Sequence, residues 1–310
     1  MLFSDFCGKC HYYSCYYGFW SLVWWFGNYC SKFSSWKKKA ELKKIDWLSR
    51  YIERNYADII QYYKEDNVKK QTLVRHYRIW VFWAQGEENM PDLVKCCYKN
   101  LLRHTQDSEV ILLTTANLKQ YLNLPLSVFN SLDRQKIGYT HLSDIVRNSL
   151  LAQYGGLWID STVWITSEIP IATLKNLSFF SPKASKFNSF WASYLLGTNK
   201  ENSILFSFVR DMLIAFCERE TYWPDYLVQD FLIRYAFNNL LSVRETMISC
   251  PDNNPKRSDL WIRMNKVFDA DEYKMLAKDN WMFKLSYKSH LKVSINGCMT
   301  YYGTMISGNL

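Results

Sequence analysis

Glycine and proline are scarce in this chain, with 11 and 7 residues respectively among 310. Disordered and fibrous proteins are rich in these residues, so both classes are excluded. No segment repeats with a period between about 20 and 50 residues, which excludes solenoids and propellers. Hydrophobic residues make up 48% of the chain, which is enough for one large domain, alone or with attached segments.

The sequence also lacks the motifs of several enzyme classes. It has no glycine-rich phosphate loop of the P-loop or dinucleotide type, and its five histidines show no Ser-His-Asp or Cys-His spacing. Nine cysteines are scattered along the chain, an odd number that argues against a disulfide framework and favours a reducing cytosol. Cys7, Cys10, His11 and Cys15 have loose zinc-ligand spacing without a second pair, so they are either a metal site or free thiols.

Residues 12–31 contain no charged side chain over 20 positions. This length could span a bilayer, but Tyr and Trp dominate the segment, and these residues prefer the membrane interface. A secretory signal peptide fits poorly, because the segment has no basic start and no small-residue cleavage site. The composition leaves open whether the segment spans the membrane or lies on it.

The basic charge follows directly after this segment. The formal net charge is +9, and residues 32–78 hold 13 Lys and Arg against 6 Asp and Glu, a surplus of +7. A uniformly basic nucleic-acid binder does not have this distribution, so no nucleic-acid partner is expected.

An amphipathic helix is predicted within the basic region. Apolar side chains recur there at steps of three and four residues: Ile45, Leu48, Ile52, Tyr56, Ile59 and Tyr63. An aromatic segment followed by a basic helix suits peripheral attachment to the inner, anionic face of the cytoplasmic membrane. The alternative is a helix that packs on the rest of the protein and keeps its lysines in water, and both can hold together.

Residues 76–310 have the pattern of an α/β domain, preceded by the segments 1–31 and 32–75. Buried strands are predicted at residues 78–86, 109–114 and 157–160, and helices from Pro91 to about Arg103 and at 118–122. Strands that alternate with helices along the chain favour a mainly parallel central sheet.

Residues 143–166 place a single acid at the end of an apolar strand. Ser143 suits the N-cap of a helix, and Gly155-Gly156 suits its end. The strand that follows ends on Asp160. Ligands of open α/β sheets bind at the carboxyl ends of the strands, so Asp160 stands where a ligand is expected.

These residues carry a resemblance to a known family. The stretch HLSDIVRNSLLAQYGGLWIDSTVWIT resembles the signature of the capsular polysaccharide synthesis proteins, which group with the DxD-motif sugar transferases around glycosyltransferase family 32. The stretches IWVFWAQGEENMPDLVKCCYKN, DYLVQDFLI and FKLSYK look like further blocks of that family. The resemblance covers roughly residues 45–295, and the first 30 residues have no counterpart in it.

The resemblance implies a GT-A-like (Rossmann-like) domain with added N-terminal helices. Such a domain would bind a nucleotide-diphosphate sugar, most simply a UDP-sugar, and pass the sugar to a saccharide or lipid-linked acceptor in bacterial capsule or surface polysaccharide synthesis. It further implies a hexosyltransferase that retains anomeric configuration and works in the cytoplasm, peripherally at the inner face of the membrane.

The resemblance also implies roles for particular residues. Asp144 and Arg147 would hold the donor sugar or its phosphates, although an ion pair within the helix explains both equally well. Gly155 and Gly156 would let the donor approach the backbone. Asp160 would be the first acid of the DxD motif and reach the sugar, the ribose or a metal ion.

The second acid of that motif is absent, because Thr162 stands at its position. A divalent cation, Mn²⁺ or Mg²⁺, is still expected at Asp160, held with the help of the donor diphosphate. If that ion is weakly held, the leaving diphosphate needs another source of positive charge. Lys284 and Lys288 are candidates, together with Arg147 and Arg134, and each could instead be an ordinary solvated basic side chain.

Three further residues are candidates for the site. Asp230 could position the acceptor hydroxyl or act as a base, or it could make a structural hydrogen bond. Pro224 would begin the helix that carries Asp230, which puts Asp225 in the first helical turn. Trp83 and Gln85 would line the base and ribose pocket, although core packing also explains a Trp at this position.

Two other functions compete with sugar transfer. The first is a non-catalytic glycan- or membrane-binding component with a degenerate GT-A fold, which the missing second acid favours. The second is a phosphosugar transferase, which would cut the diphosphate at a different bond. Asp144, Arg147, Gly155, Gly156 and Asp160 together argue for an intact sugar transferase.

Overall fold

The computed structural model describes residue 14 and residues 34–65, 69–105, 108–183 and 191–310. The proposed zinc ligands and almost all of the uncharged segment 12–31 therefore lie outside the described residues. The chain divides into two compact units. We call residues 1–69, 125–145 and 207–241 the helical unit, and residues 70–124, 146–206 and 242–310 the sheet unit.

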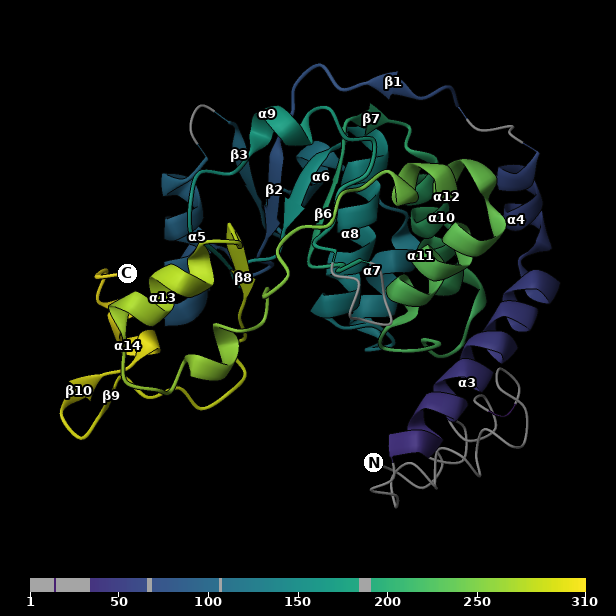
Figure 1. The fold of residues 1–310 in the computed structure, drawn as a ribbon. Helices are drawn as coiled ribbons and strands as arrows, with labels where there is room; N and C mark the ends of the chain where they lie inside the picture. The colour runs from purple at the N-terminus through teal and green to yellow at the C-terminus, as the bar shows by residue number, and fades with distance from the viewer. Residues whose placement is uncertain (1–13, 15–33, 66–68, 106–107, 184–190) are drawn as a thin grey trace. The chain divides into compact units, whose positions relative to one another are not determined.

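The sheet unit is built on four strands in the order β3-β2-β4-β6. These are β2 (Ile79–Phe82), β3 (Val110–Leu113), β4 (Gly156–Ile159) and β6 (Leu195–Thr198). Strand β2 pairs in parallel with β3 and β4, and β6 pairs antiparallel with β4 at one edge. The predicted α/β fold with a mainly parallel central sheet is therefore confirmed (Figure 1).

Shorter elements complete the sheet unit. The helices are α5 (Asp92–Arg103), α6 (Leu118–Tyr121), α9 (Ile171–Leu174), α12 (Leu241–Ile248), which starts at the boundary, α13 (Ala270–Ala277) and α14 (Tyr301–Ile306), with 3₁₀ turns η1 (Glu87–Asn89) and η2 (Trp261–Arg263). Two-stranded pairs join β1 (Thr72–Leu73) to β7 (Lys200–Glu201), β5 (Val163–Ile165) to β8 (Met282–Lys284), and β9 (Ser294–Ile295) to β10 (Cys298–Met299).

An apolar cluster ties the C-terminal elements to α5. Trp164 of β5 and Phe283 of β8 pack there with Leu93 of α5 and Tyr301 of α14. Both aromatic rings of the β5–β8 pair are buried. This packing fixes β8 against the segment that follows β4, which matters for the site below.

The helical unit contains α3 (Ser34–Asn55), α4 (Ala57–Lys64), α7 (Leu126–Asp133), the start of α8 (Tyr139–Gln153), most of α10 (Ile204–Arg219) and α11 (Val228–Asn239). The single amphipathic helix predicted from residue 45 is broken at Tyr56 into α3 and α4. Of the predicted apolar residues, Leu48, Ile52, Tyr56 and Tyr63 are buried. Ile45 and Ile59 are half-buried, and Ile60 is buried in place of Ile59.

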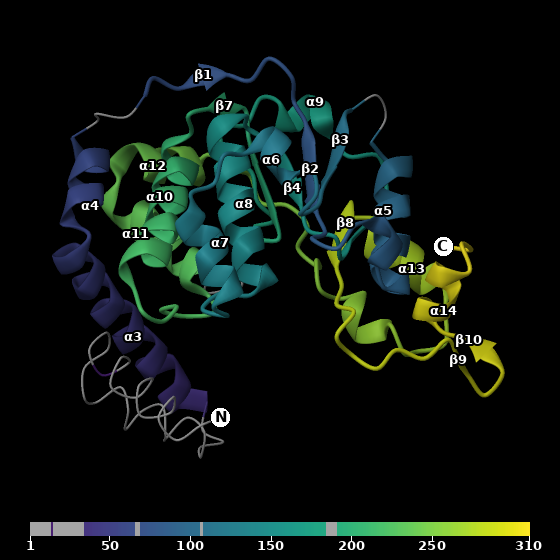
Figure 2. The ribbon, with the colours of Figure 1, turned by 180° about the vertical axis from the view of Figure 1, so that it is seen from behind.

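Helices α3 and α4 lie along α10 and α11 (Figure 2). The rings of Tyr56 and Phe216 meet edge to face with centroids 5.0 Å apart, and those of Tyr63 and Phe208 at 5.4 Å. The alternative in which the predicted amphipathic helix packs on the rest of the protein thus holds for α3 and α4. Within the residues that the structure describes, no helix is long and apolar enough to cross a membrane.

Two predicted helix starts are wrong. Helix α8 begins at Tyr139 rather than after Ser143, because Gly138 starts it: the Leu142 amide donates to the Gly138 carbonyl at 3.0 Å, and the Gly138 amide donates to Nδ1 of His141 at 3.3 Å. That side-chain contact is one half of a capping box. Helix α11 begins at Val228 rather than at Pro224, so Asp230 occupies its first turn.

Candidate functional site

Asp160 follows directly after β4, at the carboxyl end of the strand, as predicted. Strand β2 runs parallel beside β4, with Trp80 opposite Trp158. The carboxyl ends of these strands therefore lie at one edge of the sheet, where α/β folds bind their ligands. Trp83 follows β2 at this same edge.

Both carboxylate oxygens of Asp160 accept hydrogen bonds. Arg147 Nη2 donates to Oδ1 at 2.9 Å, and the Trp158 indole donates to the same oxygen at 2.8 Å. Lys284 Nζ donates to Oδ2 at 3.0 Å. The side chain of Arg147 is only 5% exposed, whereas those of Asp160 and Lys284 are 24% and 27% exposed, so the carboxylate and the ammonium form the accessible part of the cluster.

Lys284 reaches Asp160 because β5 and β8 pair. Their antiparallel register sets Val163 opposite Lys284, and the Leu285 amide donates to the Thr162 carbonyl at 2.9 Å. The ammonium of Lys284 also donates to Oγ1 of Thr162 at 2.6 Å. Thr162, at the position where the family resemblance implies a second acid, therefore binds Lys284.

The two basic groups keep Asp160 ionised. Burial by itself raises the pKa of the Asp160 carboxyl, but the charges of Lys284 and Arg147 and the Trp158 hydrogen bond lower the pKa more strongly. The net pKa lies below the usual value for an aspartate. At neutral pH the cluster is therefore a carboxylate between an ammonium and a guanidinium.

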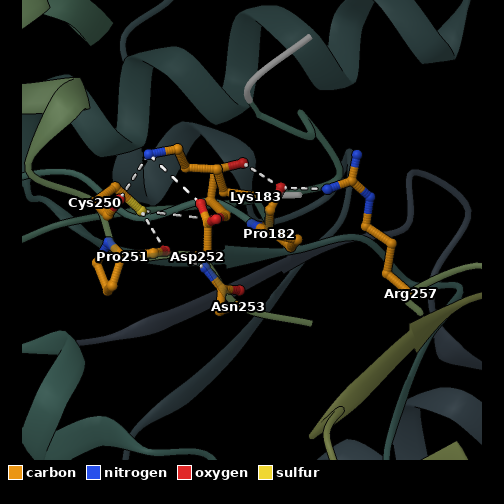
Figure 3. A network of polar contacts seen from close by, with 8 residues as sticks. Pro182, Lys183, Cys250, Pro251, Asp252, Asn253 and Arg257 are labelled. Carbon is orange, nitrogen blue, oxygen red and sulfur yellow. Dashed lines mark hydrogen bonds and ion pairs between the residues drawn. The ribbon is translucent and has the colours of Figure 1, made fainter. Parts of the chain in front are cut away.

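A third cation belongs to the same region. Arg257 is buried, and its Nη1 donates to the Pro182 carbonyl at 2.7 Å (Figure 3). Its positive charge acts on Tyr194, whose ring lies 5.2 Å from Lys284 Nζ. Burial raises the pKa of Tyr194 to about 12 against the opposing effect of Arg257, so its hydroxyl stays protonated.

The loop that carries Arg257 is anchored by polar contacts. Lys183 Nζ donates to the Cys250 carbonyl at 3.0 Å and lies 3.7 Å from the Asp252 carboxylate, and the Asn253 amide donates to the Lys183 carbonyl at 3.1 Å (Figure 3). Sequence analysis missed Arg257 and Tyr194. A basic residue in a segment rich in Pro and Asn is typical of a solvated loop, so no sequence pattern pointed to Arg257.

The charge of this cluster favours an anion. Arg147 and Lys284 both contact the single carboxylate of Asp160, which gives these three residues a formal surplus of one positive charge. Buried charge needs a partner of opposite sign, and a diphosphate supplies one.

The same residues fit a divalent cation poorly. Mg²⁺ and Mn²⁺ are bound through oxygen ligands, but the Asp160 oxygens and Thr162 Oγ1 already accept from cationic or indole donors. No group of three or more His, Cys, Asp or Glu side chains that could hold a metal occurs in the described part of the chain. The expected Mn²⁺ or Mg²⁺ stays a prediction from the resemblance.

Gly155 and Gly156 have a structural explanation that needs no ligand. Both have positive φ, +61° and +94°. A Cβ on Gly156 would lie 2.4 Å from the Arg78 carbonyl oxygen, and one on Gly155 would lie 2.4 Å from the Val74 side chain. Close approach of the protein's own chain therefore accounts for both glycines, and their role in donor binding stays a prediction.

The other predicted donor residues are less closely grouped. Trp83 packs edge to face with Tyr287 at 5.6 Å and donates from its indole to the Asn89 carbonyl at 3.3 Å. Gln85 and Lys288 are exposed. None of the described hydrogen bonds or ion pairs joins Lys288 to Asp160, in contrast to Lys284.

The last two predicted residues belong to the helical unit. Asp144 is buried on α8, one turn before Arg147. Asp230 is half-buried in the first turn of α11, where the helix dipole favours an acid. The sequence pattern had placed Asp225 in the first turn of this helix. Asp225 lies before the helix instead, where its carboxylate accepts from the Leu227 amide at 2.9 Å and pairs with Lys44. The functional roles of Asp144 and Asp230 stay predictions.

Comparison with solved structures finds glycosyltransferases with low sequence identity. The glycosyltransferase GlyE of Streptococcus pneumoniae TIGR4 is 14% identical, with a TM-score of 0.41; the match covers 76% of this chain, and this chain spans only 63% of that one. The PaToxG glycosyltransferase is 12% identical, with 74% and 93% of the two chains covered and a TM-score of 0.38. No curated protein matches the chain.

Comparison with protein families gives one broad match. Residues 29–305 match the family described as capsular polysaccharide synthesis protein. The match spans most of the chain, which therefore belongs to this family.

Proposed function

We propose that this member of the capsular polysaccharide synthesis family is a glycosyltransferase. It would take a hexose from a nucleotide-diphosphate sugar, most simply a UDP-sugar, and pass it to a saccharide or lipid-linked acceptor of a capsule or surface polysaccharide. The observation that carries this proposal is the ionised Asp160 held by Arg147 and Lys284 at the carboxyl edge of the sheet.

Sugar transfer breaks the bond between the sugar C1 and the diphosphate oxygen. The bonding electrons stay on that oxygen, the acceptor oxygen bonds to C1, and the acceptor proton leaves to a base or to water. Charge thus develops on the diphosphate, and groups that stabilise it lower the barrier. The positive charges of Arg147 and Lys284 beside Asp160 are suited to this task.

Lys284 is the residue that we assign to the leaving diphosphate. Its ammonium sits on a flexible stem and donates three hydrogen bonds, of which Asp160 and Thr162 take two. A phosphate oxygen can accept the third. In this proposal Lys284 supplies the positive charge that a divalent ion would supply beside a second acid.

Arg147 and Asp160 then act as a pair. The guanidinium of Arg147 is locked in place by Asp160 and lies 4.9 Å from the Trp158 ring centre. The quarter-exposed carboxylate of Asp160 can accept a hydrogen bond from a donor hydroxyl. The aromatic pair Trp83–Tyr287 offers a face for the nucleotide base at the same edge of the sheet.

The test is turnover of purified protein with a panel of nucleotide-diphosphate sugars, with Mg²⁺ or Mn²⁺ and then with chelator. Release of nucleoside diphosphate that is lost in Lys284→Met, and retained in the exposed neighbour variant Lys288→Met, is the expected result. Binding of a donor without turnover, with saccharide acceptors present, would favour the non-catalytic alternative. A sugar phosphate as the transferred group, identified by product mass, would favour the phosphosugar transferase.

Peripheral attachment to the cytoplasmic membrane remains part of the proposal. It is supported by the uncharged aromatic segment 12–31 and the lysines that follow it. Retention of anomeric configuration rests on the family resemblance alone, and the configuration of the product would test it.

A further inference from the structure

The helical unit contains an open cleft of about 1010 Å³ that none of the roles above uses. It lies at the C-terminal ends of α7 and α10, the start of α8 and the loop that leads towards α11. His141, Trp223 and Tyr226 supply its aromatic lining. All of its lining residues belong to the helical unit.

His141 presents a hydrogen-bond donor in this cleft. Its Nδ1 accepts from the Gly138 amide at 3.3 Å, so the proton of the neutral ring is on Nε2. Burial lowers the pKa of His141 against the opposing charge of Asp225, which keeps the ring neutral at pH 7. Nε2 is buried, and no acceptor for it occurs among the described residues.

Trp223 presents a second donor beside the first. Its side chain is only 7% exposed, and its ring centre lies 5.2 Å from that of His141. The indole N–H is also buried, again with no acceptor in the part of the chain that the structure describes. Buried donors are normally satisfied, so two adjacent ones without acceptors point to oxygen atoms supplied by a ligand.

The charges that line the cleft exclude a strongly anionic ligand. Three basic residues, Arg134, Lys136 and Arg219, stand against three acidic ones, Glu218, Glu220 and Asp225. Two of the basic groups are already engaged. Lys136 Nζ donates to the Cys217 carbonyl at 2.9 Å, and Arg219 Nη2 lies 2.6 Å from the Asp58 carboxylate.

An exposed aromatic face completes the lining. Tyr226 is 59% exposed, and its ring centre lies 5.7 Å from that of His141. The electron-rich face of an aromatic ring attracts the C–H groups of a pyranose. The hydroxyl oxygens around the sugar rim can accept from N–H donors. A balanced charge, two donors and an open ring face together match an uncharged sugar.

We propose that this cleft is a binding site for an uncharged pyranose, stacked on Tyr226 and hydrogen-bonded by His141 Nε2 and Trp223 Nε1. Binding of a sugar in this cleft does not depend on the function proposed above. The further statement that this sugar is part of the acceptor saccharide rests on that function. The site is distinct in its residues from the cluster around Asp160.

Saturation-transfer NMR on the full-length protein tests sugar binding. The probes are methyl α- and β-glycosides of glucose, galactose and N-acetylglucosamine, together with maltose, cellobiose and lactose; glucuronic acid and inorganic phosphate are the charged comparisons. We expect at least one neutral sugar to bind, and to bind better than either charged probe. If no neutral sugar binds the wild type, or if the charged probes bind better, the proposal is wrong.

Three variants locate the binding. Tyr226→Ala removes an exposed ring, and His141→Asn removes the Nε2 donor while its side-chain oxygen can still accept from Gly138. Tyr62→Ala, an exposed tyrosine on α4, is the matched control. We expect sugar affinity to fall about three- to tenfold in each cleft variant and to stay unchanged in the control. Unchanged affinity in Tyr226→Ala would overturn the site even if His141→Asn failed to fold.

Donor turnover separates this proposal from the previous one. Tyr226→Ala should leave hydrolysis of the nucleotide-diphosphate sugar by water unchanged while transfer to an added glycoside falls. A wild type that binds neutral sugars in the cleft but turns over no donor would contradict sugar transfer and leave the site intact. Transfer that is unaffected in Tyr226→Ala would remove the acceptor role.

Discussion

The ammonium of Lys284 lies 3.0 Å from Oδ2 of Asp160, although the two residues are 124 positions apart in the sequence. The same ammonium donates to Thr162 Oγ1 at 2.6 Å. It therefore lies between Asp160 and Thr162, the two positions at which the family resemblance implies a pair of acids. The proposal that Lys284 compensates for the acid absent at Thr162 rests on these two contacts.

Removal of the Lys284 charge is expected to impair the chemical step. Lys284→Met should lower kcat for release of nucleoside diphosphate by about 100- to 1000-fold, as for loss of one group that stabilises developing charge. Steady-state kinetics on the donor identified by the panel measures this. Lys288→Met, an exposed lysine four residues along, should stay within about twofold of wild type; an equal loss in both variants would contradict the assignment.

Chelation is expected to leave the activity largely intact. Because Lys284 fills the place between Asp160 and Thr162, EDTA should reduce turnover by no more than about twofold, and added Mn²⁺ should not raise it further. The double variant Lys284→Met/Thr162→Asp frees this place and restores a second acid, so its residual activity should depend on Mn²⁺. Wild-type activity that vanishes in EDTA and returns with Mn²⁺ would restore the metal expected from the resemblance.

The ion cluster should make stability depend on pH at the acid end. The folded-state pKa of Asp160 lies below its ordinary value, so its contribution is complete above the unfolded pKa of about 4 and is lost as pH falls through the folded pKa. Urea midpoints of wild type and Asp160→Asn at pH 7, 5, 4 and 3 measure this. The gap between the two proteins should be largest at neutral pH and narrow below pH 4. A gap that is constant over this range would contradict the low pKa of Asp160.

The glycines that end α8 should be required for stability rather than for donor binding. Gly156→Ala forces a Cβ to within 2.4 Å of the Arg78 carbonyl oxygen at a φ of +94°, and should cost more than about 3 kcal/mol or prevent folding. Gly86→Ala is a matched control, because its φ is +86° with no atom within 4 Å. It should cost only about 1 kcal/mol. Equal costs in urea unfolding would show that the clash is relieved.

The packing of α3 and α4 against α10 within the helical unit should depend on a buried phenol. Tyr56 is buried and its hydroxyl donates to the Glu220 carboxylate, so Tyr56→Phe should lower the free energy of unfolding by about 1.5–3 kcal/mol. Asp58→Asn weakens the exposed pair with Arg219 and should cost less than about 1 kcal/mol. Denaturant unfolding compares the two, and a larger loss in Asp58→Asn would contradict this account of the packing.

Local pattern was sufficient for the elements that are defined by a few neighbouring residues. The strands around Val81 and Trp158 are continuous apolar runs and are buried throughout. The edge strand around Leu112 is equally apolar, but only its alternate residues are buried. The helix after Pro91 follows from its periodicity. The starts of α8 and α11 were predicted wrongly at Ser143 and Pro224, although both residues have suitable local chemistry. Helix α8 begins at Tyr139, where His141 accepts from the Gly138 amide, and α11 begins at Val228.

The sequence by itself determined the family, the α/β class and the position of Asp160 at a strand end, because each depends on short-range order. Only the tertiary structure decided which cations surround Asp160. The sequence pattern does not distinguish Lys284 from Lys288. The register of β5 against β8 brings Lys284 to the Asp160 carboxylate, whereas Lys288 is exposed. The positions of Arg257 and of the N–H donors of His141 and Trp223 also follow only from the tertiary structure. Pairing and burial depend on long-range packing, which a linear pattern does not encode.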